Sequence, residues 1–266
     1  MKKRTIFLIC FLIFLMFPIY WMVVTSFKTE RETFEKTALL PEKATVEHYI
    51  EFFTNEMWRD SYFNSIGYVL INVVITLAAA IPGAYAFSRW KFRGNNHLFF
   101  WLLTNRMAPA SVFVLPFTEM YFSFHLFDTL LGVGLAHCLF NIPLAVWILE
   151  GFMSAIPREI DETAYIDGYS FFRFFRKIFF PLIAPGIGVA AFFAFTFSWV
   201  EAIIAKSLTS SEFQPMVVTI KSAIWAIEGT RWAFMSAVTV MMILPGILVV
   251  YFVRNYMAKG FSLGRV

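Results

Sequence analysis

The sequence predicts an all-α, polytopic membrane protein, from its composition, its long apolar runs and the placement of its Lys and Arg residues. Of 266 residues, 59% are hydrophobic and 15% are charged, whereas about a quarter of the residues in a soluble domain are charged. A helix needs roughly 20 apolar residues to cross about 30 Å of hydrocarbon. Six such runs predict one domain, residues 1–266, with six transmembrane helices. These are Ile6–Phe27, Ile66–Phe87, Leu98–Phe117, Leu130–Leu149, Leu182–Ala205 and Phe234–Val253.

The first run follows a basic segment, Lys2–Arg4, as the apolar part of a signal peptide does. The run is too long for a cleaved signal, and no small-residue cleavage site follows it. We therefore expect a retained first helix. The second run, Ile66–Phe87, is continuous.

The third run is interrupted by Asn105, Arg106 and Pro109. An ionisable group in hydrocarbon costs about 2.5–3.5 kcal/mol at mid-helix and is a functional candidate for that reason. Pro109 breaks the helix nearby and frees backbone carbonyls. Two interpretations remain open. Either Arg106 with Asn105 lines a translocation path, or the span is shifted and Arg106 pairs with an acid such as Glu150 or Glu201.

The fourth and fifth runs carry residues suited to contacts between helices. His137 and Asn141 lie one turn apart and share a helix face, which favours hydrogen bonding to another helix over contact with a solute. Gly186, Ala190 and Ala194 are four residues apart, a spacing that permits close helix packing. Trp199 and Glu201 lie late in the fifth run and are further candidates. The complete set of candidate residues for a substrate pathway is Asn105, Arg106, His137, Asn141, Trp199 and Glu201.

Lys and Arg residues indicate the orientation of the helices. They concentrate in short segments on the side that holds both termini, and are sparser on the other side. The rich segments are Lys2–Arg4, Arg89–Arg93, Arg158–Lys177 and Arg254–Arg265. Since short cytoplasmic loops are enriched in Lys and Arg, both termini are expected to be cytoplasmic. The loop between the fourth and fifth runs, residues 155–181, is expected on the same side.

This loop predicts a helix, a turn and a second helix. Acidic residues follow Pro157, where the positive end of a helix dipole would stabilise them. Phe residues recur at helical spacing in Phe171–Ile178, interleaved with basic residues. Gly168 stands between the two halves, where a residue without Cβ turns without penalty.

The loop also resembles the EAA loop of bacterial ABC importer permeases. Glu162-Thr163-Ala164 is followed by Asp167-Gly168, and later by Ile178 and Pro181 at the family spacing. Thr163 and Phe180 depart from the usual Ala and Leu. The segments Ala84–Arg89 and Trp199–Glu201 resemble the carbohydrate, maltose-permease-like branch, and the likeness covers essentially the whole chain.

The resemblance implies a coupling helix that docks on a separate ATPase subunit. The residues implied in that contact are Glu162, Thr163, Ala164, Asp167 and Gly168. It further implies a second, homologous permease, two ATPase subunits or a homodimer of them, and a periplasmic or lipid-anchored solute-binding protein. Ser207–Trp232 is a candidate docking lobe for that protein. No cofactor is expected on this chain, since ATP and Mg belong to the ATPase. We expect a bacterial inner-membrane location.

The residues themselves favour a transport subunit over an enzyme. The sequence has no G-x-x-x-x-G-K-[ST] loop, its four His residues are scattered, and no metal or nucleophile constellation stands out. Segments such as Thr104–Phe117 and Ala136–Met153 resemble the permeases of glycerol importers, so glycerol or another small polyol is the expected solute. The alternatives are an ion-coupled secondary transporter of a small polar solute and a non-transporting membrane scaffold.

Overall fold

A computed structural model describes residues 2–35, 38–210, 212–224 and 230–263. Within these ranges all regular structure is helical, which confirms the all-α prediction. Five helices are long and apolar enough to cross a membrane, or up to six if one bent pair forms a single span. The chain divides into two compact units, Met1–Tyr62 with Val218–Ile247, and Phe63–Val217 with Leu248–Val266.

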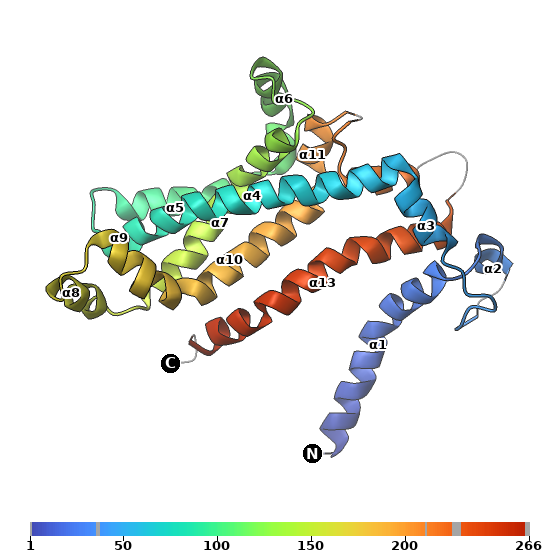
Figure 1. The fold of residues 1–266 in the computed structure, drawn as a ribbon, viewed down its shortest axis with the longest axis horizontal. Helices are drawn as coiled ribbons and strands as arrows, with labels where there is room; N and C mark the ends of the chain where they lie inside the picture. Colours follow the sequence, from blue (N-terminus) through green and yellow to red (C-terminus); the bar gives the residue numbers. More distant parts are fainter. Residues whose placement is uncertain (1, 36–37, 211, 225–229, 264–266) are drawn as a thin grey trace. The chain divides into compact units, whose positions relative to one another are not determined.

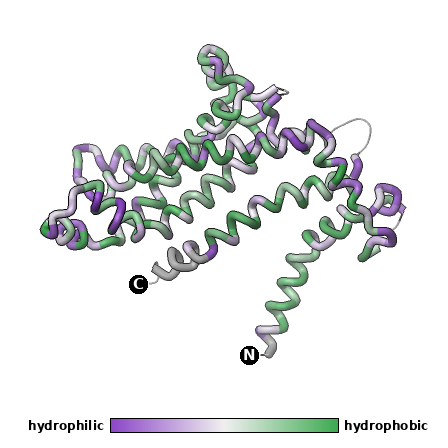
Figure 2. Tube along the Cα trace, viewed as in Figure 1, coloured by the Kyte–Doolittle hydropathy of each residue, from purple (hydrophilic) through white to green (hydrophobic). Residues whose placement is uncertain are grey.

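The first unit contains the long apolar helix α1, which Figure 2 shows as hydrophobic over most of its length. Short helices follow it, and Arg231 binds one of them by donating to both carboxylate oxygens of Glu51, at 2.5 and 2.7 Å. The helices of this unit are α1 (Lys2–Ser26), α2 (Glu30–Glu35), α3 (Glu47–Thr54), the start of α4 (Glu56–Arg89), most of α12 (Met216–Ile224) and the first half of α13 (Trp232–Leu263).

The second unit is built around α7 and α10, which run side by side in Figure 1. Besides the remainders of α4, α12 and α13, its helices are α5 (Asn95–Asn105), the 3₁₀ turn η1 (Ala110–Phe113), α6 (Val114–Ser123), α7 (Leu130–Ser154), α8 (Glu159–Ile166), α9 (Phe171–Phe174), the π-helical segment η2 (Phe175–Phe179), α10 (Phe180–Val200) and α11 (Ile203–Leu208).

The close approach of α7 and α10 depends on small residues. Gly186, Ala190 and Ala194 are all buried, as the spacing predicted. A Cβ atom on Gly186 would lie 2.7 Å from Cγ of Phe152 on α7, which is closer than two carbon atoms can pack. Glycine therefore allows the two helices to touch at this level.

The third apolar run, Leu98–Phe117, forms two helices, and the break lies at the interruption that the sequence shows around Asn105, Arg106 and Pro109. α5 ends at Asn105, η1 and α6 follow, and the two parts are bent by 92°. Pro109 has an extended backbone at the break. Because proline lacks an N–H and disfavours the helical conformation in the residue before it, it favours a break in the helix at this point.

The fifth predicted span also ends differently from the expectation Leu182–Ala205. α10 stops at Val200, Glu201 is extended, and the short helix α11 begins at Ile203. At its other end α10 is preceded by the π segment η2. Pro181 has no N–H to donate to the carbonyl of Lys177, so the regular α-helical bonding is interrupted where the π segment lies.

Candidate functional site

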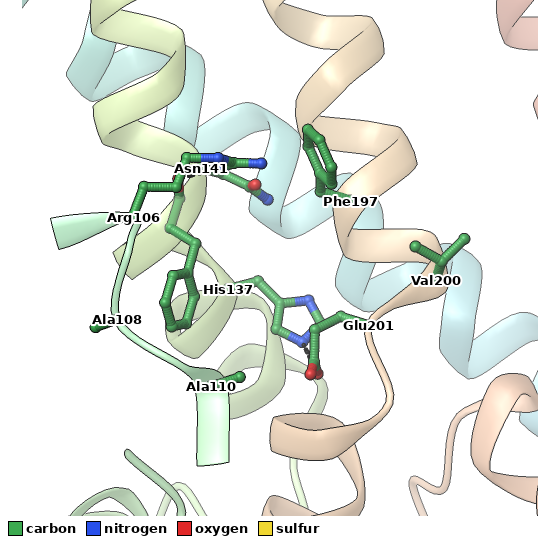
Figure 3. Close-up of a pocket in the computed structure, with 9 residues that line it drawn as sticks. Arg106, Ala108, Ala110, His137, Asn141, Phe197, Val200 and Glu201 are labelled. Carbon is green, nitrogen blue, oxygen red and sulfur yellow. Dashed lines mark hydrogen bonds and ion pairs between the residues drawn. The ribbon is translucent and has the colours of Figure 1, made fainter. Parts of the chain in front are cut away.

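A cavity of about 280 Å³ opens beside the two breaks just described. Figure 3 shows side chains converging on it from the bend between α5 and η1, from α7, and from the end of α10. The lining residues are Arg106, Ala108, Ala110, His137, Phe140, Asn141, Phe197, Val200 and Glu201. Four of the six sequence-predicted pathway residues are among them.

Arg106 provides the cation of this cavity. Its guanidinium donates to the carbonyl of Phe140 at 2.8 Å and lies 4.1 Å from the ring centre of Phe197. Within the described part of the chain, no ion pair joins Arg106 to Glu150 or Glu201. The structure thus favours the interpretation in which Arg106 lines the cavity over the one in which it pairs with an acid.

Glu201 and His137 form a polar link between α10 and α7. His137 contacts Ser198 through Nδ1 at 2.7 Å and Glu201 through Nε2 at 3.2 Å. The Glu201 carboxylate also accepts three backbone N–H groups at the start of α11, those of Ile203, Ile204 and Ala205, at 2.8–3.1 Å. A carboxylate stabilises a helix start in this way because it accepts donors that have no partner within the helix. The position of Glu201 in the cavity wall is therefore fixed from two sides.

Asn141 connects α7 to two further helices. Its amide donates to Oδ1 of Asn72 on α4 at 2.7 Å and to the carbonyl of Ala194 on α10 at 3.3 Å. The inter-helix hydrogen bonds expected of His137 and Asn141 are thus present. The Oδ1 atom of Asn141 is buried and has no hydrogen-bond partner within the described residues. An acceptor of this kind beside a cavity suits a ligand hydroxyl group.

Two predicted pathway residues do not line the cavity. Trp199 is buried and stacks on Phe195, and Asn105 lies at the end of α5. The sequence reasoning in turn missed Asn72 and Ser198, which hold Asn141 and His137 in place. Asn72 could have been found as a polar residue in the middle of an apolar run.

The predicted coupling segment forms a helix that ends on a glycine turn. The backbone N–H of Gly168 donates to the carbonyl of Tyr165, and that of Tyr169 donates to the carbonyl of Ala164. Gly168 has φ of +78°. These features make a Schellman motif, which ends a helix by satisfying its last carbonyls and favours glycine at the left-handed position. The predicted helix, turn and second helix are present in α8, Gly168 and α9.

Among the five residues that the resemblance assigns to ATPase contact, only Ala164 is buried. It packs in a cluster with Phe174 and Phe179. Glu162, Thr163, Asp167 and Gly168 are exposed. Next to them lies a groove lined by Glu159, Ile160, Thr163, Ala164, Asp167 and Ile178. α8 thus presents an open face that a partner can contact, while Ala164 holds the helix from behind.

Comparisons with known proteins agree with this arrangement. Residues 2–263 match the family model described as binding-protein-dependent transport system inner membrane component. The chain is 33% identical over 195 residues to the trehalose transport system permease protein SugB of Mycobacterium tuberculosis, covering 73% of this chain and 71% of that protein. It is 25% identical over 256 residues to the diacetylchitobiose uptake system permease protein DasC of Streptomyces coelicolor, covering 95% and 92%.

A solved structure has the same fold. It is the crystal structure of a bacterial ABC transporter involved in the import of the acidic polysaccharide alginate, and it superposes with a TM-score of 0.81 at 22% identity, covering 96% of this chain and 95% of that chain.

The fold, the coupling segment and the family match define a class of protein, the membrane permeases of binding-protein-dependent ABC importers. The chain belongs to the binding-protein-dependent transport system inner membrane component family. It is a multi-pass bacterial inner-membrane transport subunit and not an enzyme. The resemblance to the carbohydrate, maltose-permease-like branch of ABC importer permeases is confirmed. Family membership therefore argues against the two alternatives, an ion-coupled secondary transporter and a non-transporting scaffold.

Proposed function

We propose that this permease imports a small neutral carbohydrate or polyol, with glycerol as the favoured solute. The observation that carries the proposal is the cavity at the breaks of α5–η1 and α10–α11. Its volume of about 280 Å³ is at or below the lower end for drug-sized ligands, about 300–1,000 Å³. The relatives are named for diacetylchitobiose and trehalose transport, which supports the carbohydrate class. Glycerol rests on the sequence resemblance and on the size of the cavity.

The lining of the cavity suits a polyol. Arg106 makes one hydrogen bond to the carbonyl of Phe140 and has further N–H donors. The Oδ1 atom of Asn141 is an acceptor with no partner within the described residues. Phe140 and Phe197 supply apolar faces for the carbon atoms of the solute. Asn105 and Trp199, which do not line the cavity, are proposed only as neighbours that support its wall.

Energy for import comes from separate ATPase subunits, which hold ATP and Mg. We place their contact on the exposed face of α8, at Glu162, Thr163, Asp167 and Gly168, with Ala164 shaping the groove from behind. A second homologous permease, two ATPase subunits or a homodimer, and a periplasmic or lipid-anchored binding protein complete the transporter. The segment Ser207–Trp232, of which residues 211 and 225–229 lie outside the described residues, is the proposed docking lobe for the binding protein.

Uptake into proteoliposomes tests the solute and the energy source together. The purified complex is reconstituted with ATP on the side of α8 and the binding protein on the other, and uptake of radiolabelled glycerol is measured with and without excess trehalose. We expect ATP-dependent glycerol uptake that trehalose does not reduce. Trehalose uptake without glycerol uptake would refute glycerol as the solute. Uptake that survives ATP depletion and stops with an uncoupler would refute the ATPase partnership.

A substitution in the cavity tests the site. Arg106→Gln removes the charge while keeping a polar side chain, and it should lower the ATP-dependent uptake by about tenfold or more, since one or two hydrogen bonds to the solute are lost. Co-purification of the ATPase should be unchanged. Arg93→Gln, an exposed arginine after α4, is the matched control.

A further inference from the structure

A buried arginine behind the coupling helix joins three helix ends. Arg89 is the last residue of α4. Its Nε and one terminal nitrogen donate to the two carboxylate oxygens of Asp161 on α8, at 2.8 and 3.2 Å. The side chains of Arg89 and Asp161 are only 5% and 11% exposed. This is a forked pair of two parallel hydrogen bonds, which fixes orientation as well as distance.

The same guanidinium also binds the end of α7. Its other terminal nitrogen donates to the carbonyls of Met153 and Ile156, both at 3.1 Å. Met153 is in the last turn of α7, where carbonyls have no partner within the helix and a cation is favourable. Asp161 is in the first turn of α8, where a carboxylate is favourable for the opposite reason. The Arg89 side chain thus hydrogen-bonds both the end of α7 and the beginning of α8.

Surrounding contacts keep this junction rigid. The guanidinium lies 5.0 Å from the ring centre of Phe179, which is fully buried. Arg158, just before α8, donates to the carbonyl of Ser88 at 3.3 Å, which is a second link between α8 and the end of α4. With Arg89 bonded on both edges of its planar fork, α8 has little freedom to move without the ends of α4 and α7.

The helix at the other side of this junction lines the cavity. α7 carries His137, Phe140 and Asn141, all of which line it. A displacement of α8 is therefore passed along a continuous helix to the cavity wall. We infer that Arg89 and Asp161 are positioning residues that couple the ATPase-docking helix to the solute cavity. This inference rests on the proposed ATPase contact at α8.

The test measures the response of the cavity to nucleotide at the ATPase. In the full complex, a single reporter thiol is placed in the cavity wall by Ala110→Cys, and its labelling rate with N-ethylmaleimide is measured with and without ATP and orthovanadate. The parent chain, which keeps Cys10 and Cys138, gives the background. Coupling between two sites is typically worth a 5–150-fold change, so we expect a change of about fivefold or more with Arg89 and Asp161 intact.

Four further substitutions in the reporter background decide the role of the pair. Arg89→Lys keeps the charge and loses the fork, and Asp161→Asn keeps the shape and loses the charge. We expect both to reduce the nucleotide-dependent change to less than about twofold while the ATPase still co-purifies. Asp161→Glu, which keeps a carboxylate, should retain most of the nucleotide-dependent change in labelling rate. Arg93→Lys, at an exposed arginine outside the junction, should match the reporter alone.

The outcomes are distinct. A wild-type response in both Arg89→Lys and Asp161→Asn, with the ATPase bound, would overturn the inference, as would a reporter that never responds to nucleotide. If Arg89→Lys does not accumulate in the membrane, the comparison of Asp161→Asn with Asp161→Glu decides alone. Failure of the ATPase to co-purify with the unsubstituted chain would instead refute the proposed function.

Discussion

At the scale of single residues, Glu201 carries more contacts than any sequence pattern indicated. It was a candidate for the solute path, and the structure shows it holding the start of α11 and the ring of His137. Its carboxylate therefore defines the wall of the cavity more than it offers a free group to a solute.

Glu201→Gln should lower stability, because an amide leaves only one oxygen to accept the α11 donors. Loss of a helix-start acceptor costs about 1–2 kcal/mol, so we expect a lower apparent melting temperature in mild detergent and slower uptake. Glu119→Gln, at an exposed acid on α6, is the control. An unchanged melting temperature in Glu201→Gln would show that α11 does not depend on this carboxylate.

Another residue pair, Glu51 with Arg231, predicts a dependence on pH. The hydrogen bonds and charge of Arg231 hold the pKa of Glu51 below its ordinary value, against the opposing effect of burial. A carboxyl group with a lowered folded-state pKa contributes stability above its unfolded pKa, and that contribution is lost as the pH falls through the folded-state pKa.

The difference in melting temperature between the unsubstituted chain and Glu51→Gln should therefore be constant near neutral pH and shrink on acidification below the ordinary carboxyl pKa. Glu47→Gln, at an exposed position on the same helix, should show no such trend. A difference that grows on acidification would contradict the assignment.

At the scale of helices, the packing of α7 on α10 makes a sharp contrast between two glycines. Gly186→Ala forces a Cβ to 2.7 Å from the Phe152 ring, whereas no atom of another described segment lies within 4 Å of a Cβ at Gly151. We expect Gly186→Ala to destabilise by about 1–3 kcal/mol, and Gly151→Ala to be neutral or to stabilise by about 0.5–1 kcal/mol. Thermal unfolding of the two purified variants checks this, and equal effects would refute the packing argument.

The helices also show what sequence can and cannot predict. Apolar runs locate the spans because a helix that crosses the hydrocarbon layer needs about 20 apolar residues. Pro109 indicates the break in the third run because a missing N–H disturbs the helix at that residue, whatever the tertiary structure. The turn at Gly168 was found for the same reason. In contrast, the contact of Arg89 with Asp161 joins positions 72 residues apart. Only the packed fold brings these two residues together, so no local sequence pattern predicts their contact.

At the scale of the whole molecule, the chain needs partners, and the coupling segment is where to test them. Gly168→Trp puts a bulky side chain on a residue with φ of +78°, a conformation that costs other residues roughly 1–2 kcal/mol. Pull-down from the native membrane in mild detergent should recover a Walker-type ATPase with the unsubstituted chain and less with Gly168→Trp. Gly94→Trp, at an exposed glycine that also has positive φ, is the matched control. Equal recovery in all three would remove Gly168 from the contact.

The π segment η2 preserves the facing of the coupling helices relative to the spanning helix α10. Its i→i+5 bonding takes in about one extra residue, whereas each residue of a regular α-helix turns the chain by about 100°. Removal of one residue from Phe175–Phe179 would leave a regular α turn with nearly the same facing on either side. Removal of one residue from the regular part of α10 would instead rotate α9 and α8 by about 100° relative to the rest of that helix, and Asp161 would then face away from Arg89.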